Sequence, residues 1–152
     1  MHQHNNLFEL VSKNLETDRY RELNWTGSFP DYLQLAYENP EVLRTSFQRV
    51  HDMIVSKGSE SSSQLTSRDC VHWNFFDDPD QDGENAVFGL DLPLQQLVSF
   101  FKSAAHCLGS ERRVLLLHGP VGSAKSAIVN LLKKGLERYS RVPEGALYTF
   151  QW

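Results

Sequence analysis

Apolar residues recur at helical spacing through the first part of the chain and predict helices there. The first predicted helix spans Leu7 to Glu22 and has its apolar residues on one face. Ser28, with Asp31 three residues later, is typical of a capping box and predicts a second helix that runs to Glu38.

A third helix is expected to start at Asn39-Pro40 and to end at Gly58. Its buried face is expected to be a narrow stripe of four apolar residues, Leu43, Phe47, Val50 and Ile54. Together these patterns predict a small helical bundle over residues 1–58, and a groove that binds a partner is the alternative.

The composition changes after this bundle. Residues 59–69 are rich in Ser, Gln, Thr and charged residues, which is typical of a flexible connection and a domain boundary. Residues 77–85 then form an acidic stretch. Asp78, Asp80 and Asp82 stand at positions 1, 3 and 5 of a calcium-loop pattern, but position 12, where a bidentate Glu is required, is a glycine. We expect a solvated acidic turn, with calcium binding as the alternative.

The second half of the chain alternates helices with continuous apolar runs. A fourth helix is expected from its N-cap Asp91 to Gly109, with inward-facing residues Leu94, Leu97, Val98, Phe101, Ala105 and Leu108. The run Val114–Leu117 is apolar throughout, as in a strand that is buried on both faces. A helix over 127–139 and a second strand over 146–152 follow. This order predicts the start of a parallel α/β sheet.

Between the first of these strands and the next helix lie eight residues of phosphate-loop type, Gly119, Pro120, Val121, Gly122, Ser123, Ala124, Lys125 and Ser126. Such a loop points backbone amides at an anion, and the helix N-terminus adds the positive end of its dipole. At this spacing Lys125 reaches the β- and γ-phosphates of a nucleotide, and the hydroxyl of Ser126 binds Mg²⁺. The alternative is a structural turn with a surface lysine.

Ala124 departs from the phosphate-loop pattern, which has glycine at this position. If the position requires a positive φ, the alanine costs ~1–2 kcal/mol.

Composition narrows the class of protein. The chain has 152 residues, of which 40% are apolar and 22% are charged, as in globular proteins. Its net charge of −4 argues against a broad nucleic-acid-binding surface. Cys70 and Cys107 match no metal-binding spacing, so reduced thiols are expected. No apolar run is long enough to cross a membrane and no signal peptide opens the chain, so we expect a cytoplasmic protein.

Six segments spread over nearly the whole chain form a more specific set than the phosphate loop alone. They are LNWTGSF (23–29), FQRVHDMI (47–54), VFGLD (87–91), RRVLLLHGPVG (112–122), LLKKGL (131–136) and GALYTF (145–150). This set resembles the PrkA-type serine protein kinases, bacterial proteins whose N-terminal part is an AAA+ ATPase-like domain.

The resemblance implies that residues 119–126 bind ATP with Mg²⁺, with Lys125 and Ser126 in the roles given above. The acidic Mg²⁺-positioning motif, the sensor residues, the arginine finger and the kinase-like region of the family would follow Trp152. Phosphoryl transfer depends on such groups. The chain is therefore expected to be an N-terminal fragment that has no catalytic residue in this span and no phosphoryl transfer of its own.

The resemblance also implies a base-binding segment, because AAA+ proteins place a matching segment against the adenine ring. In this chain the segment consists of Val87, Phe88 and Gly89. Packing of Val87 and Phe88 in the core is the alternative.

Taken with the resemblance, the patterns predict an α/β protein in three parts. A helical lobe (1–58) and a polar, acidic linker (59–85) precede the incomplete start of a P-loop NTPase parallel sheet of the AAA+ class (86–152). The implied function is the ATP-binding part of a serine/threonine protein kinase with a protein substrate, and a homo-oligomer is one form it could take. The alternative is a nucleotide-regulated partner-binding or assembly module. No nucleic acid or membrane partner is expected.

Overall fold

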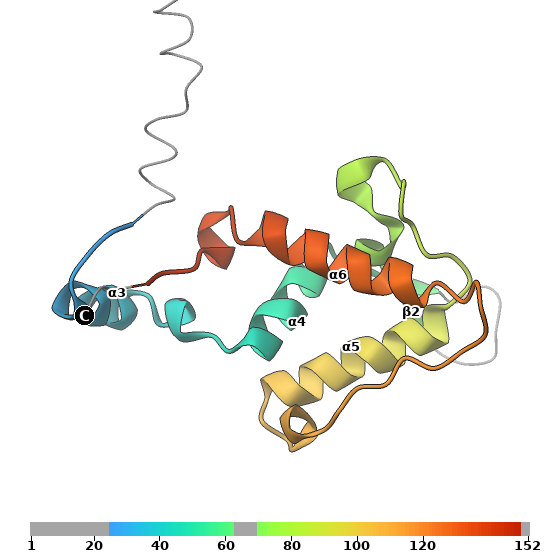
Figure 1. Ribbon diagram of the computed structural model, residues 1–152, viewed down its shortest axis with the longest axis horizontal. Helices are drawn as coiled ribbons and strands as arrows, with labels where there is room; N and C mark the ends of the chain where they lie inside the picture. Colours follow the sequence, from blue (N-terminus) through green and yellow to red (C-terminus); the bar gives the residue numbers. More distant parts are fainter. Residues whose placement is uncertain (1–24, 63–69, 150–152) are drawn as a thin grey trace, which may run out of the picture. The chain divides into compact units, whose positions relative to one another are not determined.

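The computed structural model describes residues 25–62 and 70–149 (Figure 1). This part of the chain is mostly helical and holds one two-stranded antiparallel sheet. One compact unit comprises Leu43–Gly145, and the other comprises the residues up to Val42 with those from Ala146 onward. The predicted helix from Leu7 to Glu22 lies outside the described residues. The predicted domain boundaries at residues 58 and 85 stay a prediction.

The predicted capping box starts the first described helix, α3 (Phe29–Glu38). The carboxylate of Asp31 accepts hydrogen bonds from the hydroxyl and the backbone N–H of Ser28, at 2.6 and 2.8 Å. These bonds lower the pKa of Asp31. In the same unit, Trp25 meets the ring of Tyr148 edge-on at a centroid distance of 5.8 Å. The prediction of this helix is confirmed.

The single helix predicted from Asn39 to Gly58 is wrong in its first part. A short 3₁₀ helix (Pro40–Leu43) is followed by a break, and α4 (Ser46–Ser56) begins after its own N-cap, Thr45. The side chain of Gln48 accepts a 2.8 Å hydrogen bond from the Thr45 N–H, and this capping box favours a new start. Leu43 is consequently 59% exposed and leaves the predicted stripe.

The rest of the stripe and the end of α4 agree with the sequence pattern. Ile54 is fully buried, and Phe47 and Val50 pack against the core. Gly58 follows the helix with φ +82°, and its N–H donates to the carbonyl of Val55 at 2.9 Å. A left-handed residue after the last turn is the common helix end for which glycine is suited.

Residues that the polar composition assigned to a flexible connection form a strand. β1 (Ser59–Ser62) pairs antiparallel with β2 (Cys70–Trp73), with Ser59 opposite Trp73. In the ladder, backbone N–H and C=O groups of the two strands bond to each other, so a strand can form from polar residues too. The polar composition of this segment therefore did not reveal it. Residues 63–69 lie outside the described residues.

The apolar core of the larger unit lies where three helices meet the segment after β2. α5 (Asp91–Ala105) packs against α4 and β2, and α4 also packs against α6 (Lys125–Tyr139) (Figure 1). The buried members of this core are Met53, Ile54, Phe75, Phe76, Val87, Leu94, Leu97, Val98, Phe101, Ile128 and Leu131. The helix predicted over 127–139 is therefore confirmed, and it begins two residues earlier.

The fourth predicted helix is shorter than expected. Leu90 is the N-cap of α5, and Asp91 is its first residue. The helix ends at Ala105, so Leu108 lies beyond it and is 72% exposed instead of facing inward. Cys107 and Gly109 both adopt positive φ, which ends the helical path. The other five predicted inward residues are buried.

The two strands of the predicted parallel sheet are not formed in the described part of the chain. Residues 114–117 run without strand pairing, and Val114 and Leu116 are 94% and 80% exposed. Residues 146–149 are likewise unpaired, and 150–152 lie outside the described residues. A strand requires a neighbour to accept its hydrogen bonds, and the described residues provide none at either position.

Polar contacts tie the end of α6 to α4. Arg49 of α4 is buried, and its guanidinium donates a hydrogen bond to the carbonyl of Gly145, in the 3₁₀ turn Pro143–Gly145 that follows α6. Burial lowers the pKa of Arg49. Arg44 reaches the carbonyl of Glu144 at 3.5 Å. The 3₁₀ turn Pro143–Gly145 is thus bound to both arginines.

Gly135 marks the closest approach of α6 to its neighbours and provides a test of this packing. A Cβ at this position would lie 2.7 Å from a ring carbon of Phe75 and 2.9 Å from the sulfur of Met53. We expect Gly135→Ala to lower the free energy of unfolding by ~1–3 kcal/mol, as overpacked cores do. Urea unfolding measures this change.

Ser99→Ala, on the exposed side of α5, is the matched control and is expected to change stability by less than ~0.5 kcal/mol. An increase in stability for Gly135→Ala would contradict the packing, because it is what an open helical position gives.

Candidate nucleotide-binding site

The loop 119–126 follows the mostly exposed run 113–118, of which Leu117 packs against the core, and reaches α6 through two left-handed residues. Gly122 has φ +84°, and Ala124 has φ +55° and is the N-cap of α6. Ala124 therefore occupies the strained conformation that the sequence pattern reserves for glycine. Val121 at the tip of the loop is fully exposed.

Lys125 is folded back across this loop. Its ammonium donates hydrogen bonds to the carbonyl of Gly119 at 2.9 Å, to the carbonyl of Pro120 at 2.5 Å and to the hydroxyl of Ser123 at 2.8 Å. A lysine has three donors, and all three are engaged by the loop. The positive charge is thus held against the loop by three neutral oxygen acceptors.

Gly119 is required by a close approach. A Cβ on Gly119 would lie 2.7 Å from the hydroxyl oxygen of Ser123. That hydroxyl also donates to the carbonyl of Pro120 at 2.8 Å. The loop is therefore closed upon itself by Ser123, and a larger residue at its first position would require the Ser123 hydroxyl to move.

The N-terminus of α6 is open to an anion. Ala124 has no side-chain acceptor, so no side chain caps the first turn. The first free N–H groups and the helix dipole then favour a negative charge at this end. Ser126 lies in the first turn and is exposed. The structure therefore brings Lys125, Ser126 and uncapped amides to one end of α6.

The predicted base-binding segment is divided between core and solvent. Val87 is 3% exposed, and its N–H donates to the carbonyl of Phe76 at 2.9 Å. Phe88 is 78% exposed, and Gly89 has φ +72°. Val87 and Ile128 of α6 belong to the same core, and Ala124 also packs against this core. One apolar core therefore supports both candidate parts of the site.

The acidic turn is solvated only in part: Asp80, Asp82 and Glu84 are exposed as predicted, whereas Asp78 is buried. Asp78 is 2% exposed, and its carboxylate lies 3.6 Å from the guanidinium of Arg138 on α6. Within the described ranges no group of three or more His, Cys, Asp or Glu residues could hold a metal ion. Because Arg138 is distant in sequence, no local pattern revealed this ion pair.

His72 of β2 is a second residue that the sequence pattern did not single out. Its ring nitrogens lie 2.8 Å from the carboxylates of Asp91 and Asp77. The hydrogen bond to Asp91, followed by that to Asp77, raises the pKa of His72. An ionised carboxylate only accepts hydrogen bonds, so the protonated form of the ring, in which both nitrogens donate, is the form that these two carboxylates favour. His72 ties together the two ends of the segment that carries Val87.

Comparison with known proteins gives the class of this chain. The family model described as the PrkA AAA domain matches residues 27–151, which include the whole loop and α6. The protein is thus one of the AAA-type domain proteins. The chain belongs to the PrkA family within that class.

Two relatives are similar over most of this chain. The ATP-dependent protease PrkA of Bacillus subtilis (strain 168) is 39% identical over 139 residues, which cover 88% of this chain and 20% of that protein. An uncharacterized protein in gldA 5'region of Geobacillus stearothermophilus is 31% identical over 107 residues, 68% of this chain and 98% of that protein. The chain therefore spans about a fifth of the length of the Bacillus subtilis relative. No solved structure matches.

The strained Ala124 leads to a prediction about the loop. Ala124→Gly relieves ~1–2 kcal/mol of left-handed strain and adds ~0.5–1 kcal/mol of backbone entropy to the unfolded chain. We expect a net rise of about 0.5–1 kcal/mol in the free energy of unfolding, measured by urea denaturation.

Ala127→Gly, three residues later and inside α6, is the matched control. Its backbone is helical, so glycine there is expected to lower stability by ~0.5–1 kcal/mol. An equal loss in both variants would show that Ala124 carries no strain.

Proposed function

We propose that residues 119–126 bind the phosphates of ATP together with Mg²⁺. The observation that carries this proposal is the position of Lys125, whose ammonium is held over a glycine-containing loop at the uncapped end of a helix. When a nucleotide binds, the ammonium exchanges its carbonyl partners for phosphate oxygens, which are stronger acceptors because they are charged. The hydroxyl of Ser126 then faces the bound Mg²⁺ as a ligand.

The family supports this assignment, because AAA-type domains are nucleotide-binding domains and the matched range contains the loop. We propose further that Phe88 and Gly89 lie against the adenine ring. Phe88 presents an exposed aromatic side chain, and the neighbouring glycine allows a flat base to approach the backbone. Val87 anchors this segment to the core.

The exposed apolar runs fit a parallel sheet in the longer protein. Val114 and Leu116 are almost fully exposed although they form a continuous apolar run before the loop. Burial of such a run is expected to drive strand pairing. We propose that residues 114–117 and 146–152 become strands of a parallel AAA+ sheet together with residues outside those described.

For the full-length protein we propose an ATP-dependent enzyme that acts on protein substrates in the cytoplasm. The resemblance to serine protein kinases implies phosphoryl transfer to a protein, whereas the Bacillus subtilis relative is named a protease. Both activities require the same ATP site. Transfer of radiolabelled γ-phosphate to protein and cleavage of a protein substrate, each measured with and without ATP, separate the two. ATP binding with neither activity would favour a nucleotide-regulated assembly module.

Lys125→Ala tests the phosphate site. Loss of a charge-assisted hydrogen bond is expected to weaken ATP binding by ~1.5–3 kcal/mol, about 10- to 150-fold in the dissociation constant. Calorimetric titration of the full-length protein measures this change. Lys133→Ala, at an exposed position of the same helix, is the matched control and should leave the affinity unchanged.

Ser126→Ala in the same titration resolves the role of the metal. If the hydroxyl binds Mg²⁺, affinity falls in the presence of Mg²⁺ and stays nearly constant without it. An equal loss under both conditions would assign Ser126 to the helix start instead.

Equal affinity of Lys125→Ala and the wild type would refute the phosphate site.

A further inference from the structure

The acidic segment before Val87, residues 77–85, forms a closed turn that hydrogen bonds inside it hold together. The carbonyl of Phe76 accepts the N–H of Val87 at 2.9 Å, which joins the two ends of the turn. Inside it, the carboxylate of Asp78 accepts hydrogen bonds from the backbone N–H and the side-chain amide of Asn85, both at 3.1 Å. Asp78 and Asp82 adopt left-handed conformations with φ +50°. The turn therefore has a defined shape, and Val87 lies at its exit.

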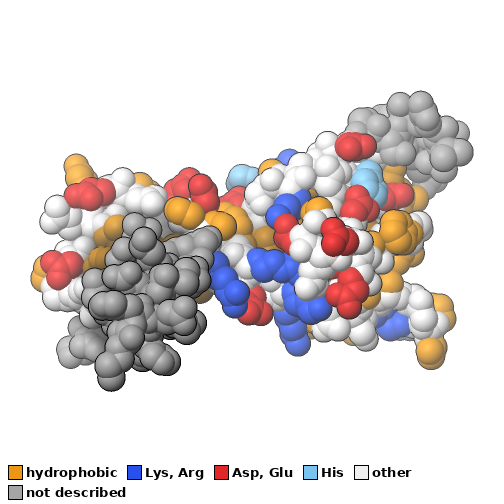
Figure 2. Space-filling model, turned by 90° about the horizontal axis from the view of Figure 1, so that it is seen from above, with side chains coloured by type: hydrophobic (Ala, Val, Ile, Leu, Met, Phe, Trp, Pro, Cys, Tyr) orange, Lys and Arg blue, Asp and Glu red, His pale blue; other side chains and the backbone are white. Residues whose placement is uncertain are grey.

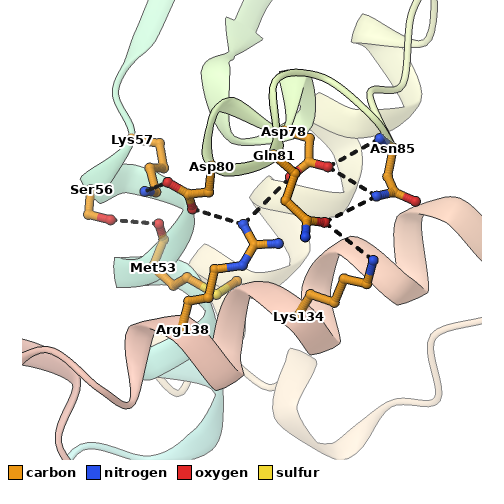
Figure 3. Close-up of polar contacts among 9 residues, drawn as sticks. All are labelled: Met53, Ser56, Lys57, Asp78, Asp80, Gln81, Asn85, Lys134 and Arg138. Carbon is orange, nitrogen blue, oxygen red and sulfur yellow. Dashed lines mark hydrogen bonds and ion pairs between the residues drawn. The ribbon is translucent and has the colours of Figure 1, made fainter. Parts of the chain in front are cut away.

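This turn is fastened to α6 by ion pairs (Figure 3). Arg138 lies 3.6 Å from the carboxylate of Asp78 and 3.1 Å from that of Asp80. Lys134, one turn earlier on the helix, donates to the side chain of Gln81 at 3.3 Å. We call the contacts of Arg138 with Asp78 and Asp80 the acidic clamp.

The acidic clamp is more deeply buried than a surface ion pair. The side chain of Asp78 is 1% exposed, and that of Arg138 is 30% exposed. A buried carboxylate that loses its cation is costly, because its charge is then left unpaired out of water. Lys57, next to the end of α4, adds a 2.7 Å bond to Asp80, and this bond lowers the pKa of Asp80. Lys and Arg side chains also lie directly beside Asp and Glu side chains on the face shown in Figure 2.

The acidic clamp joins the two candidate halves of the nucleotide site. One partner, the acidic turn, leads directly into Val87, Phe88 and Gly89. The other partner, α6, begins at Lys125 with the phosphate loop. Arg138 is thirteen residues from Lys125, about 20 Å along a helix, so it lies too far from the loop to touch phosphate. A helix is stiff over this length, so a contact at its far end can still fix the position of its start relative to the turn.

We propose that Arg138 is a positioning residue that sets the spacing between the base-binding segment and the phosphate loop through the acidic clamp. This inference rests on the proposed ATP site. A nucleoside triphosphate must contact both halves at once, whereas inorganic tripolyphosphate needs only the loop. Loss of the clamp is therefore expected to weaken ATP binding selectively.

The test compares the binding of ATP and of tripolyphosphate to the full-length protein by calorimetry. For Arg138→Gln we expect an ATP dissociation constant that rises ~10-fold, while that of tripolyphosphate changes less than ~2-fold. Arg138→Lys keeps the charge and is expected to recover most of the ATP affinity. Arg141→Gln, which removes an exposed arginine whose partner among the described residues is Glu137 of α6, is the matched control and should change neither value.

Asp80→Asn weakens the clamp from its exposed side and keeps the test informative if Arg138→Gln folds poorly. It is expected to reduce ATP affinity by ~3-fold and to leave tripolyphosphate unchanged. Equal weakening of both ligands would overturn the proposal, because it would show general damage to α6. Unchanged ATP binding in Arg138→Gln would overturn it as well.

The outcome also separates this inference from the function on which it rests. If Lys125→Ala binds ATP as the wild type does, the phosphate site itself is refuted and the positioning role falls with it. If Lys125→Ala loses ATP while Arg138→Gln does not, the phosphate site stands and only the positioning role is refuted.

Discussion

The close packing of α6 against α4 and Phe75 is the constraint on which the candidate site depends. Ile128 and Leu131 anchor the helix in the core, and Gly135 lets it approach Phe75 more closely than any larger residue would. Because α6 is held along its length, its first turn has a fixed position. The loop residues and Lys125 are presented from that turn. The chemistry proposed for the loop is therefore a consequence of burial further along the helix.

Charged contacts hold the same helix where apolar packing ends. Arg49 reaches the turn after α6, and Arg138 reaches the acidic turn that leads into Val87. His72 fastens both ends of the segment between Asp77 and Asp91. Each of these side chains meets carbonyl or carboxylate oxygens within the larger compact unit. Such pairs cost desolvation, but once formed they allow few alternative arrangements.

Local patterns predicted the features that depend on near neighbours. The capping box of Ser28, the left-handed Gly58 and the helix over 127–139 follow from residues within one or two turns, and the structure contains them. The break before Thr45 was missed, because a second capping box competes with a continuous apolar stripe.

Features that depend on distant partners could not be predicted in this way. Asp78 looked like part of a solvated turn, since its partner Arg138 lies 60 residues away. The run 114–117 looked like a buried strand, but its hydrogen bonds require neighbours that the described residues do not supply. In the loop 119–126, Lys125 lies over left-handed residues at the start of α6, and no local pattern tests what binds there. The ligand of that loop is still a proposal.

Amide hydrogen exchange of the full-length protein, measured with and without ATP and Mg²⁺, tests the central claim most directly. The account predicts slower exchange on ATP addition in two separate peptides, one covering residues 119–126 and one covering residues 87–89. It also predicts that Lys125→Ala abolishes both effects. Exchange in the 119–126 peptide that is the same with and without ATP would contradict the account, because it would show that the loop at the start of α6 does not hold the nucleotide.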